Sequence, residues 1–118
     1  MSPQDLELEK MGNTLNTLLD SFDESLGDKV EELPAGLKGE ELVFAACDNL
    51  FDLLSEPIKP SNREAADTLR YGLLALLPPP KTIREANKLR NGDDLRVAVN
   101  AVKAYAQALV SQRDASGG

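Results

Sequence analysis

Carboxylate side chains are the residues of this sequence whose type and spacing could support chemistry. They recur three or four residues apart in leucine- and alanine-rich stretches, as Asp20, Asp23 and Glu24, then Asp48 and Asp52, then Glu64 and Asp67. Acids at these spacings share one side of a helix, and carboxylate oxygens from facing helices are suitable ligands for Mg²⁺. Metal-dependent hydrolysis of a nucleotide by an all-helical protein is therefore one function to consider.

The helical projection of these acids argues against such a metal site. At about 100° per residue, Asp48, Asp52, Glu64 and Asp67 lie roughly 120–160° from the centre of the apolar side of their own helix. Carboxylates that point to solvent from different helices do not converge on one ion. The sequence also lacks histidine and shows no phosphate-binding glycine loop or nucleophile motif. We therefore expect no catalytic residue, no cofactor and no metal, and we retain the hydrolase as an alternative.

Length and composition predict one soluble domain. The chain has 118 residues, of which 42% are hydrophobic, 28% are charged and only 4% are aromatic. A core built from leucine, valine and alanine favours helices. No apolar stretch approaches the ~20 residues that span a bilayer, and the first residues do not resemble a signal peptide, so we expect a cytoplasmic protein without membrane contact. Cys47 lies in an apolar run and is expected to be a buried thiol.

Helix signals cover most of the chain. Three Ser/Thr-x-x-Asp/Glu patterns, beginning at Ser2, Ser61 and Thr82, are typical of helix starts. Pro57 and the run from Pro78 to Pro80 end the helices that precede them, because proline disfavours helical angles in the residue before it. These signals predict five helical segments, at about residues 2–26, 39–55, 61–76, 82–91 and 93–112.

The predicted fold class is all-α, a compact bundle of four to five helices with short proline- and glycine-containing connections. We expect a single helical domain at residues 1–112 and a flexible C-terminal tail at residues 113–118. Apolar residues spaced three and four apart identify the side of each helix that faces the core. The residues expected to be buried are Leu15, Leu18, Phe22, Leu50, Leu69, Leu73, Val102 and Leu109.

Charge is distributed unevenly along the chain. The formal net charge is −7, and residues 1–56 carry 14 acids and 3 bases whereas residues 57–118 carry 6 acids and 10 bases. The two halves can pair inside the bundle, in weak surface ion pairs, or the basic half can face an anionic partner. An acidic mimic of nucleic acid, formed by the acids of the first two helices, is another alternative. Binding to nucleic acid itself is disfavoured, because it needs several cations on one surface.

A protein–protein contact is the function that we expect, in a regulatory or adaptor protein or in a small subunit of an assembly. The third helix carries an aromatic and a leucine that project away from its apolar stripe, and the chain's densest cations follow it. An apolar centre with a charged rim is typical of interfaces. The predicted partner-binding residues are Arg70, Tyr71, Leu74, Lys81, Arg84 and Lys88.

The last helix carries a second stripe, made almost wholly of small residues. It consists of Val97, Ala101, Ala104 and Ala108. Small side chains let another helix approach closely, so this helix is either the central element of the domain, flanked on two sides, or half of a homodimer interface. We favour the first interpretation and keep the homodimer as the alternative.

Overall fold

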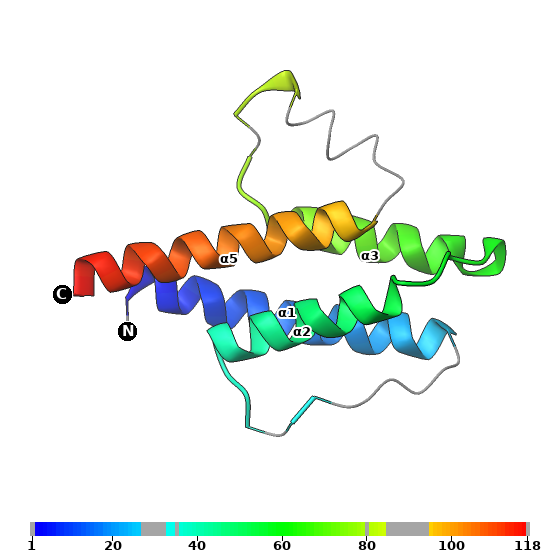
Figure 1. The fold of residues 1–118 in the computed structure, drawn as a ribbon, viewed down its shortest axis with the longest axis horizontal. Coiled ribbons are helices and arrows are strands. Elements are labelled where there is room, and N and C mark those ends of the chain that lie inside the picture. The colour runs from blue at the N-terminus through cyan, green and yellow to red at the C-terminus, as the bar shows by residue number, and fades with distance from the viewer. Residues whose placement is uncertain (1, 27–32, 35, 80, 85–94, 118) are drawn as a thin grey trace.

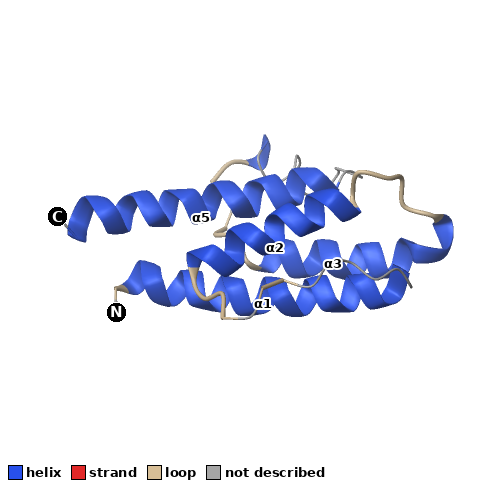
Figure 2. Ribbon diagram, turned by 60° about the horizontal axis from the view of Figure 1, so that its bottom comes forward, coloured by secondary structure: helices blue, strands red, loops and turns tan. Residues whose placement is uncertain are grey.

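The structure is a computed structural model that describes residues 2–26, 33–34, 36–79, 81–84 and 95–117. Within these ranges the chain forms α1 (Pro3–Leu26), α2 (Glu40–Leu53), a short 3-10 turn η1 (Pro60–Asn62), α3 (Arg63–Ala75) and α5 (Leu95–Gly117), as Figures 1 and 2 show. The same ranges contain no β-strand. The predicted all-α fold is confirmed.

The start of α1 follows the predicted capping pattern. The Ser2 hydroxyl oxygen accepts a hydrogen bond from the Asp5 backbone N–H at 3.1 Å, and the same hydroxyl donates to Asp5 Oδ2 at 3.0 Å. This satisfies one of the backbone donors that a helix leaves unpaired in its first turn. The negative charge of Asp5 also lies at the positive end of the helix.

The start of α2 depends on a glycine, and its end lies before a proline. Gly39 precedes the first helical residue at φ 59°, a left-handed conformation that glycine adopts without a steric penalty. At the other end, the Leu54 N–H still donates to Leu50 O and the Ser55 hydroxyl donates to Asp52 O at 2.7 Å. The chain then leaves the helix ahead of Pro57, as expected.

The C-terminal end of α3 agrees with the prediction, whereas its N-terminal end does not. The helix ends at Ala75, and Leu76 and Leu77 donate to Leu73 O and Leu74 O just before the prolines, as predicted. The capping pattern predicted at Ser61 is wrong: Asn62 is the residue that precedes α3, and it makes no side-chain capping bond. Pro60 begins a 3-10 turn, and this turn continues directly into the helix, which leaves Ser61 no capping position.

The C-terminal helix is longer than predicted. α5 continues to Gly117, although we placed the end of the folded domain at Gln112 and a flexible tail after it. Arg113 lies in this extension and contacts the starts of α1 and α2, which gives the extra turn partners elsewhere in the bundle. Of the fourth predicted helix, only residues 82–84 are described, and Ile83 and Arg84 are helical.

Contacts between helices define their directions. Gly12 of α1 lies against Gly39 O and Leu42 at the start of α2, and Phe22 lies beside Leu53 at the end of α2, so α1 and α2 run parallel. In α5, Arg113 contacts Glu40 and Lys103 contacts Asp48, so α5 runs opposite to α2.

The third helix completes the topology. Leu18 of α1 lies against Gly72 of α3, and Phe22 lies beside Asn62 and Ala65. Because the residue number rises along one helix and falls along the other, α3 is antiparallel to α1. The described helices therefore form an up-up-down-down bundle, and the colour gradient in Figure 1 shows the direction of each helix.

This topology sets a minimum length for two of the connections between helices. Parallel neighbours require the chain to return along the length of the bundle before the second helix begins. In the sequence, residues 27–39 stand between α1 and α2, and residues 76–94 stand between α3 and α5. The connection from α2 to α3, at residues 54–62, joins two helices that run in opposite directions without packing closely against each other, and it contains η1.

The core lies where α1, α2, α3 and α5 meet. Seven of the eight residues predicted to be buried are buried: Leu15, Phe22, Leu50, Leu69, Leu73, Val102 and Leu109. The exception is Leu18, which is only partly buried although it packs against the core. A Cβ at Gly72 would lie 2.5 Å from the Leu18 side chain, so Leu18 occupies the space that the missing side chain of Gly72 leaves, at the edge of the bundle.

The acidic and basic halves of the chain pair with each other in the bundle. Lys103 Nζ lies 3.6 Å from Asp48 Oδ1, and it lies 6.0 Å from the centre of the Phe51 ring. Arg113 Nη1 and Nη2 lie 3.0 Å from Asp5 Oδ1 and Glu40 Oε1 respectively. These ion pairs agree with the first of the two alternatives, in which the acidic and basic halves of the chain pair with each other.

The helices of the described chain are too short or too polar to cross a bilayer.

Candidate functional site

The outer side of α3 presents the aromatic residue predicted to bind a partner. Tyr71 is 73% exposed, whereas Leu69 and Leu73 on the same helix are buried. Tyr71 lies about 160° around the helix axis from both of these leucines. The predicted orientation of α3 is therefore confirmed at this residue.

Arg70 and Leu74 lie on the flank of α3 that faces α5 and not on its outermost side. Both are partly buried. Arg70 lines a hollow of about 230 Å³ between α3 and the start of α5, together with Ile58, Arg63, Ala66, Asp67 and Leu95. Leu74 follows Arg70 by one turn. The three predicted residues of α3 therefore differ in solvent exposure: Tyr71 is exposed, whereas Arg70 and Leu74 are partly buried.

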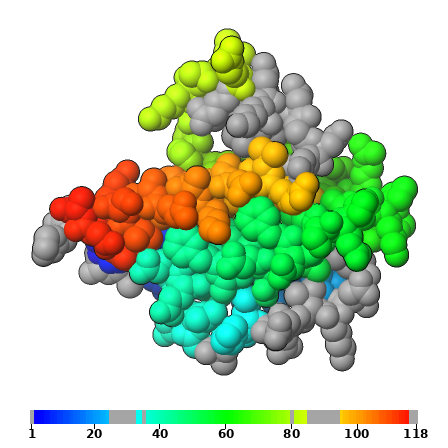
Figure 3. Space-filling view, in the orientation of Figure 1, coloured from blue at the N-terminus to red at the C-terminus, as the bar shows by residue number. Residues whose placement is uncertain are grey.

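The cations predicted to flank this surface lie on a segment that projects from the bundle. Residues 81–84 stand clear of the helices at the top of Figure 1, and Figure 3 shows the same projection. Lys81 and Arg84 are exposed, and Lys88 lies outside the described residues. Between the two cations is Ile83, which is 81% exposed. Sequence reasoning missed Ile83, because a lone isoleucine in a predicted helix is usually assigned to its packed side.

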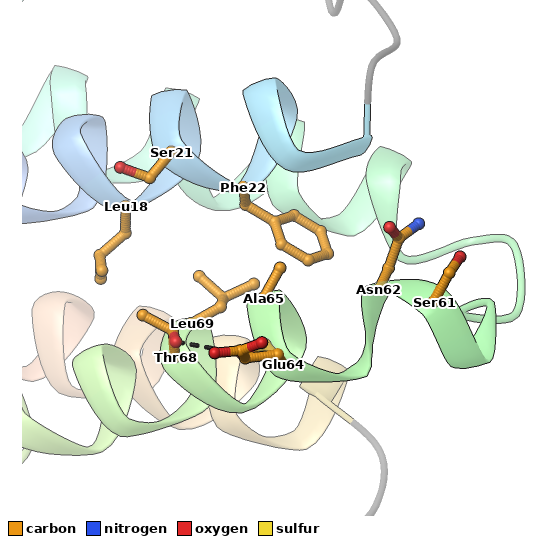
Figure 4. Close-up of a pocket in the computed structure, with 9 residues that line it drawn as sticks. All are labelled: Leu18, Ser21, Phe22, Ser61, Asn62, Glu64, Ala65, Thr68 and Leu69. Atoms are coloured by element: carbon orange, nitrogen blue, oxygen red, sulfur yellow. Dashed lines mark hydrogen bonds between the residues drawn. The ribbon is translucent and has the colours of Figure 1, made fainter.

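A groove separates α1 from the N-terminal half of α3 (Figure 4). Leu18 and Phe22 point into it from α1, and Ala65 and Leu69 point into it from α3. We call this feature the α1/α3 groove. Its volume is about 430 Å³, and Ser21, Ser61, Asn62, Glu64 and Thr68 complete its lining.

A second hollow adjoins the α1/α3 groove at η1. We call it the η1 hollow; it has a volume of about 190 Å³ and is lined by Phe22, Asp52, Leu53, Ser55, Glu56, Pro57, Ile58, Lys59 and Asn62. Phe22 and Asn62 line both spaces. The two hollows therefore follow one another around the start of α3. Their floors are apolar, and among the described residues in their polar linings the acids Asp52, Glu56 and Glu64 outnumber the one base, Lys59.

The starts of α1 and α2 meet the C-terminal part of α5 around Arg113, at the end of the bundle away from η1. Its guanidinium bonds Asp5, Glu40 and, at 3.2 Å, Asp114. The hydrogen bond from Arg113, followed by that from Ser2, holds the pKa of Asp5 below its usual value, and the bonds to Asp5 and Glu40 raise the pKa of Arg113. Asp5 and Glu40 also place negative charge at the starts of α1 and α2, where it is favourable, so this junction has a structural role.

We expect Arg113→Gln to lower the melting temperature at neutral pH and to have little effect in strong acid. Because the pKa of Asp5 is depressed in the folded state, its contribution to stability is present above the ordinary pKa of 3.8 and is lost as the pH falls through the lower folded value. Thermal unfolding measured from pH 7 to pH 2 checks this, with the exposed-site variant Lys10→Gln as control. A difference between wild type and Arg113→Gln that persists undiminished at pH 2 would contradict it.

The candidate metal-binding carboxylates are spread over three helices. Asp20, Asp48, Asp52, Glu64 and Asp67 are exposed, and so is Glu24, while Asp23 is partly buried. Among the described residues, no group of three or more potential metal ligands comes together. The acids of α2 and α3 therefore project to solvent, as we predicted.

Cys47 is fully buried in the core, as predicted. Burial raises the pKa of its thiol to about 11. At neutral pH the residue is a thiol, which is a much weaker nucleophile than a thiolate. It packs as a small apolar side chain.

The small-residue stripe of α5 is only partly covered. Val97 and Ala101 are partly buried, whereas Ala104 and Ala108 are exposed. The buried side of α5 includes Val99 and Ala106 instead, and the helix contacts α1, α2 and α3. α1 likewise contacts the other three described helices, so α5 is flanked by neighbours but is not alone at the centre of the bundle. Its second buried row is not the stripe that we chose, and the homodimer through that stripe stays a prediction.

The fold and its surfaces define a class: an all-α bundle with up-up-down-down topology in its described helices and a charged junction at one end. Comparisons with protein-family models, with curated proteins and with solved structures find no match.

Proposed function

We propose that this chain is a non-catalytic protein-interaction module whose partner docks on the outer side of α3 around Tyr71. The observation that supports the proposal is the 73% exposure of this aromatic ring in the middle of a helix. Tyrosine is enriched among the residues that dominate binding energy at interfaces, because its ring provides a large apolar area and its hydroxyl a hydrogen bond.

The surroundings of Tyr71 fit a contact with a mixed apolar and acidic surface. Arg70 and Leu74 extend the surface towards α5, and the exposed cations Lys81 and Arg84 lie on the segment that follows α3. Lys88 belongs to the proposed surface by its position in the sequence. Charges at the rim of an interface mainly accelerate association, whereas the apolar centre contributes most of the affinity.

The two alternatives have less support from the described residues. A metal-dependent hydrolase requires carboxylates that converge, and the candidate acids are mostly exposed on separate helices. An acidic mimic of nucleic acid requires a free row of acids on the first two helices. Asp5, Glu40 and Asp48 in those helices pair instead with Arg113 and Lys103 of the same chain.

We expect Tyr71→Ala to weaken partner binding at least fivefold, which corresponds to about 1 kcal/mol. The experiment captures proteins from the native cell on the tagged chain, identifies the partner and measures its dissociation constant by titration calorimetry. The melting temperature should not change, because the removed ring is exposed. Lys81→Ala should mainly slow association and reduce its salt dependence.

The matched control is Leu6→Ala, which removes another exposed apolar side chain, 56% accessible, from α1. It should bind the partner normally. If Tyr71→Ala and Leu6→Ala bind equally well, Tyr71 is not an anchor and the proposed surface is wrong.

A further inference from the structure

The projecting segment 81–84 and the acidic hollows around the start of α3 have complementary properties. We propose that this segment of one molecule docks into the α1/α3 groove of a second copy of the chain. Ile83 then covers the apolar floor of the groove, and Lys81 and Arg84 lie near Glu64 at its rim and near Asp52 and Glu56 of the adjoining η1 hollow. This inference shares Lys81 and Arg84 with the surface proposed around Tyr71, but Ile83 and the α1/α3 groove are not part of that surface, and the inference does not rest on the proposed function.

The apolar component of the proposal is the match between Ile83 and the groove floor. Ile83 is the most exposed large apolar side chain in the described part of the protein, at 81%. In the groove, Leu18 and Ala65 are partly buried and therefore leave apolar surface accessible above Phe22 and Leu69. Covering the groove with Ile83 removes apolar surface of both molecules from water. The groove volume of about 430 Å³ falls in the usual range for binding pockets, about 300–1,000 Å³.

The electrostatic component is a difference in sign between segment and rim. Glu64 lines the α1/α3 groove, and Asp52 and Glu56 line the adjoining η1 hollow; all three are exposed. Among the residues that the structure describes, Lys59 is the one cation that lines either space. The segment at residues 81–84 carries Lys81 and Arg84 and no acid. Complementary charges of this kind favour the encounter and set the orientation of the docked segment.

The occupant is a second copy because the segment and the groove lie apart in one molecule. In Figure 1 the segment rises on one side of α5, whereas α1 lies on the other side. Each molecule therefore offers a segment and a groove on different surfaces. Association through two different surfaces is head-to-tail, so species larger than a dimer are expected as the concentration rises.

Two charge-reversed variants test the pairing by analytical ultracentrifugation of the full chain. Lys81→Glu/Arg84→Glu carries an acidic segment, and Glu56→Lys/Glu64→Lys carries a basic rim. Each variant alone should stay monomeric where the wild type associates, and an equimolar mixture of the two should associate again. The rim variant also excludes a simple effect of net charge. Its formal charge changes from −7 to −3, which would favour association, whereas the proposal predicts that association is lost.

Further variants separate this inference from the proposed function. Ile83→Ser should reduce self-association at least tenfold, whereas Tyr71→Ala should leave it unchanged. Circular dichroism and melting are recorded for each variant; if Glu64→Lys impairs folding of α3, Asp52→Lys/Glu56→Lys replaces it. A wild-type chain that remains monomeric up to about 1 mM, or a mixture of folded reversed variants that does not associate, overturns the proposal.

Discussion

Leu15→Ala is expected to reduce the free energy of unfolding by about 2–5 kcal/mol, the usual cost of removing a fully buried leucine. The Leu15 side chain has no exposed surface and lies in the core with residues of α2, α3 and α5. The loss combines the transfer of apolar atoms to water with the cavity that the packed neighbours leave. Because small domains have marginal stability, the variant can be largely unfolded at room temperature. Urea denaturation followed by circular dichroism measures the change.

The control for this prediction lies on the same helix. Leu6→Ala is the same substitution in α1 at a side chain that is 56% exposed, and it should cost less than about 0.5 kcal/mol. Comparing the two variants removes the effect of helix propensity, which is identical for both. Equal losses at Leu6 and Leu15 would show that α1 does not present its Leu15 side to the core.

Gly12→Val is expected to cost about 1–3 kcal/mol or more, because it forces atoms into a closely packed contact between parallel helices. A Cβ at Gly12 would lie 3.2 Å from Gly39 O and 3.2 Å from Leu42 Cβ. Neither of these atoms is the mobile end of a side chain, so relief requires α1 and α2 to separate. The two additional methyl groups of valine increase the overlap.

Asn13→Val is the matched control for the glycine variant. Asn13 is the next residue of the same helix and is exposed, and asparagine and valine have similar helix propensities. Its unfolding free energy should change by less than about 0.5 kcal/mol. If Gly12→Val is as stable as the wild type, the start of α2 does not pack on Gly12, and the parallel arrangement of α1 and α2 loses its main contact.

Local signals determined the helices. The capping bond between Ser2 and Asp5, the left-handed Gly39 and the prolines after α2 and α3 act through neighbouring residues, so their effects follow from the sequence alone. The apolar spacing likewise identified the buried side of each helix, and Tyr71 lies on the exposed side that it predicts. The failure at Ser61 is also local in origin: Pro60 begins a 3-10 turn that competes with the predicted cap.

Tertiary contacts decided the features that have no local signal. The apolar stripe of α1 is the same whether α2 runs parallel or antiparallel to it. The parallel direction follows from tertiary contacts, in which Gly12 lies against Gly39 and Leu42, and Phe22 lies beside Leu53. In the extension of α5, Arg113 contacts Asp5 and Glu40, which are remote in the sequence and give no local signal.

Of the two proposed surfaces, one follows from the sequence and the other from the tertiary structure. Helical periodicity alone placed Tyr71 outside the core. The exposure of Ile83 and the acidic hollows around the start of α3 depend on where the chain goes after each helix ends. Burial is a property of the assembled bundle: a residue loses contact with water only when another element covers it. The sequence therefore determined which residues could be covered, and the tertiary structure decided which of them were.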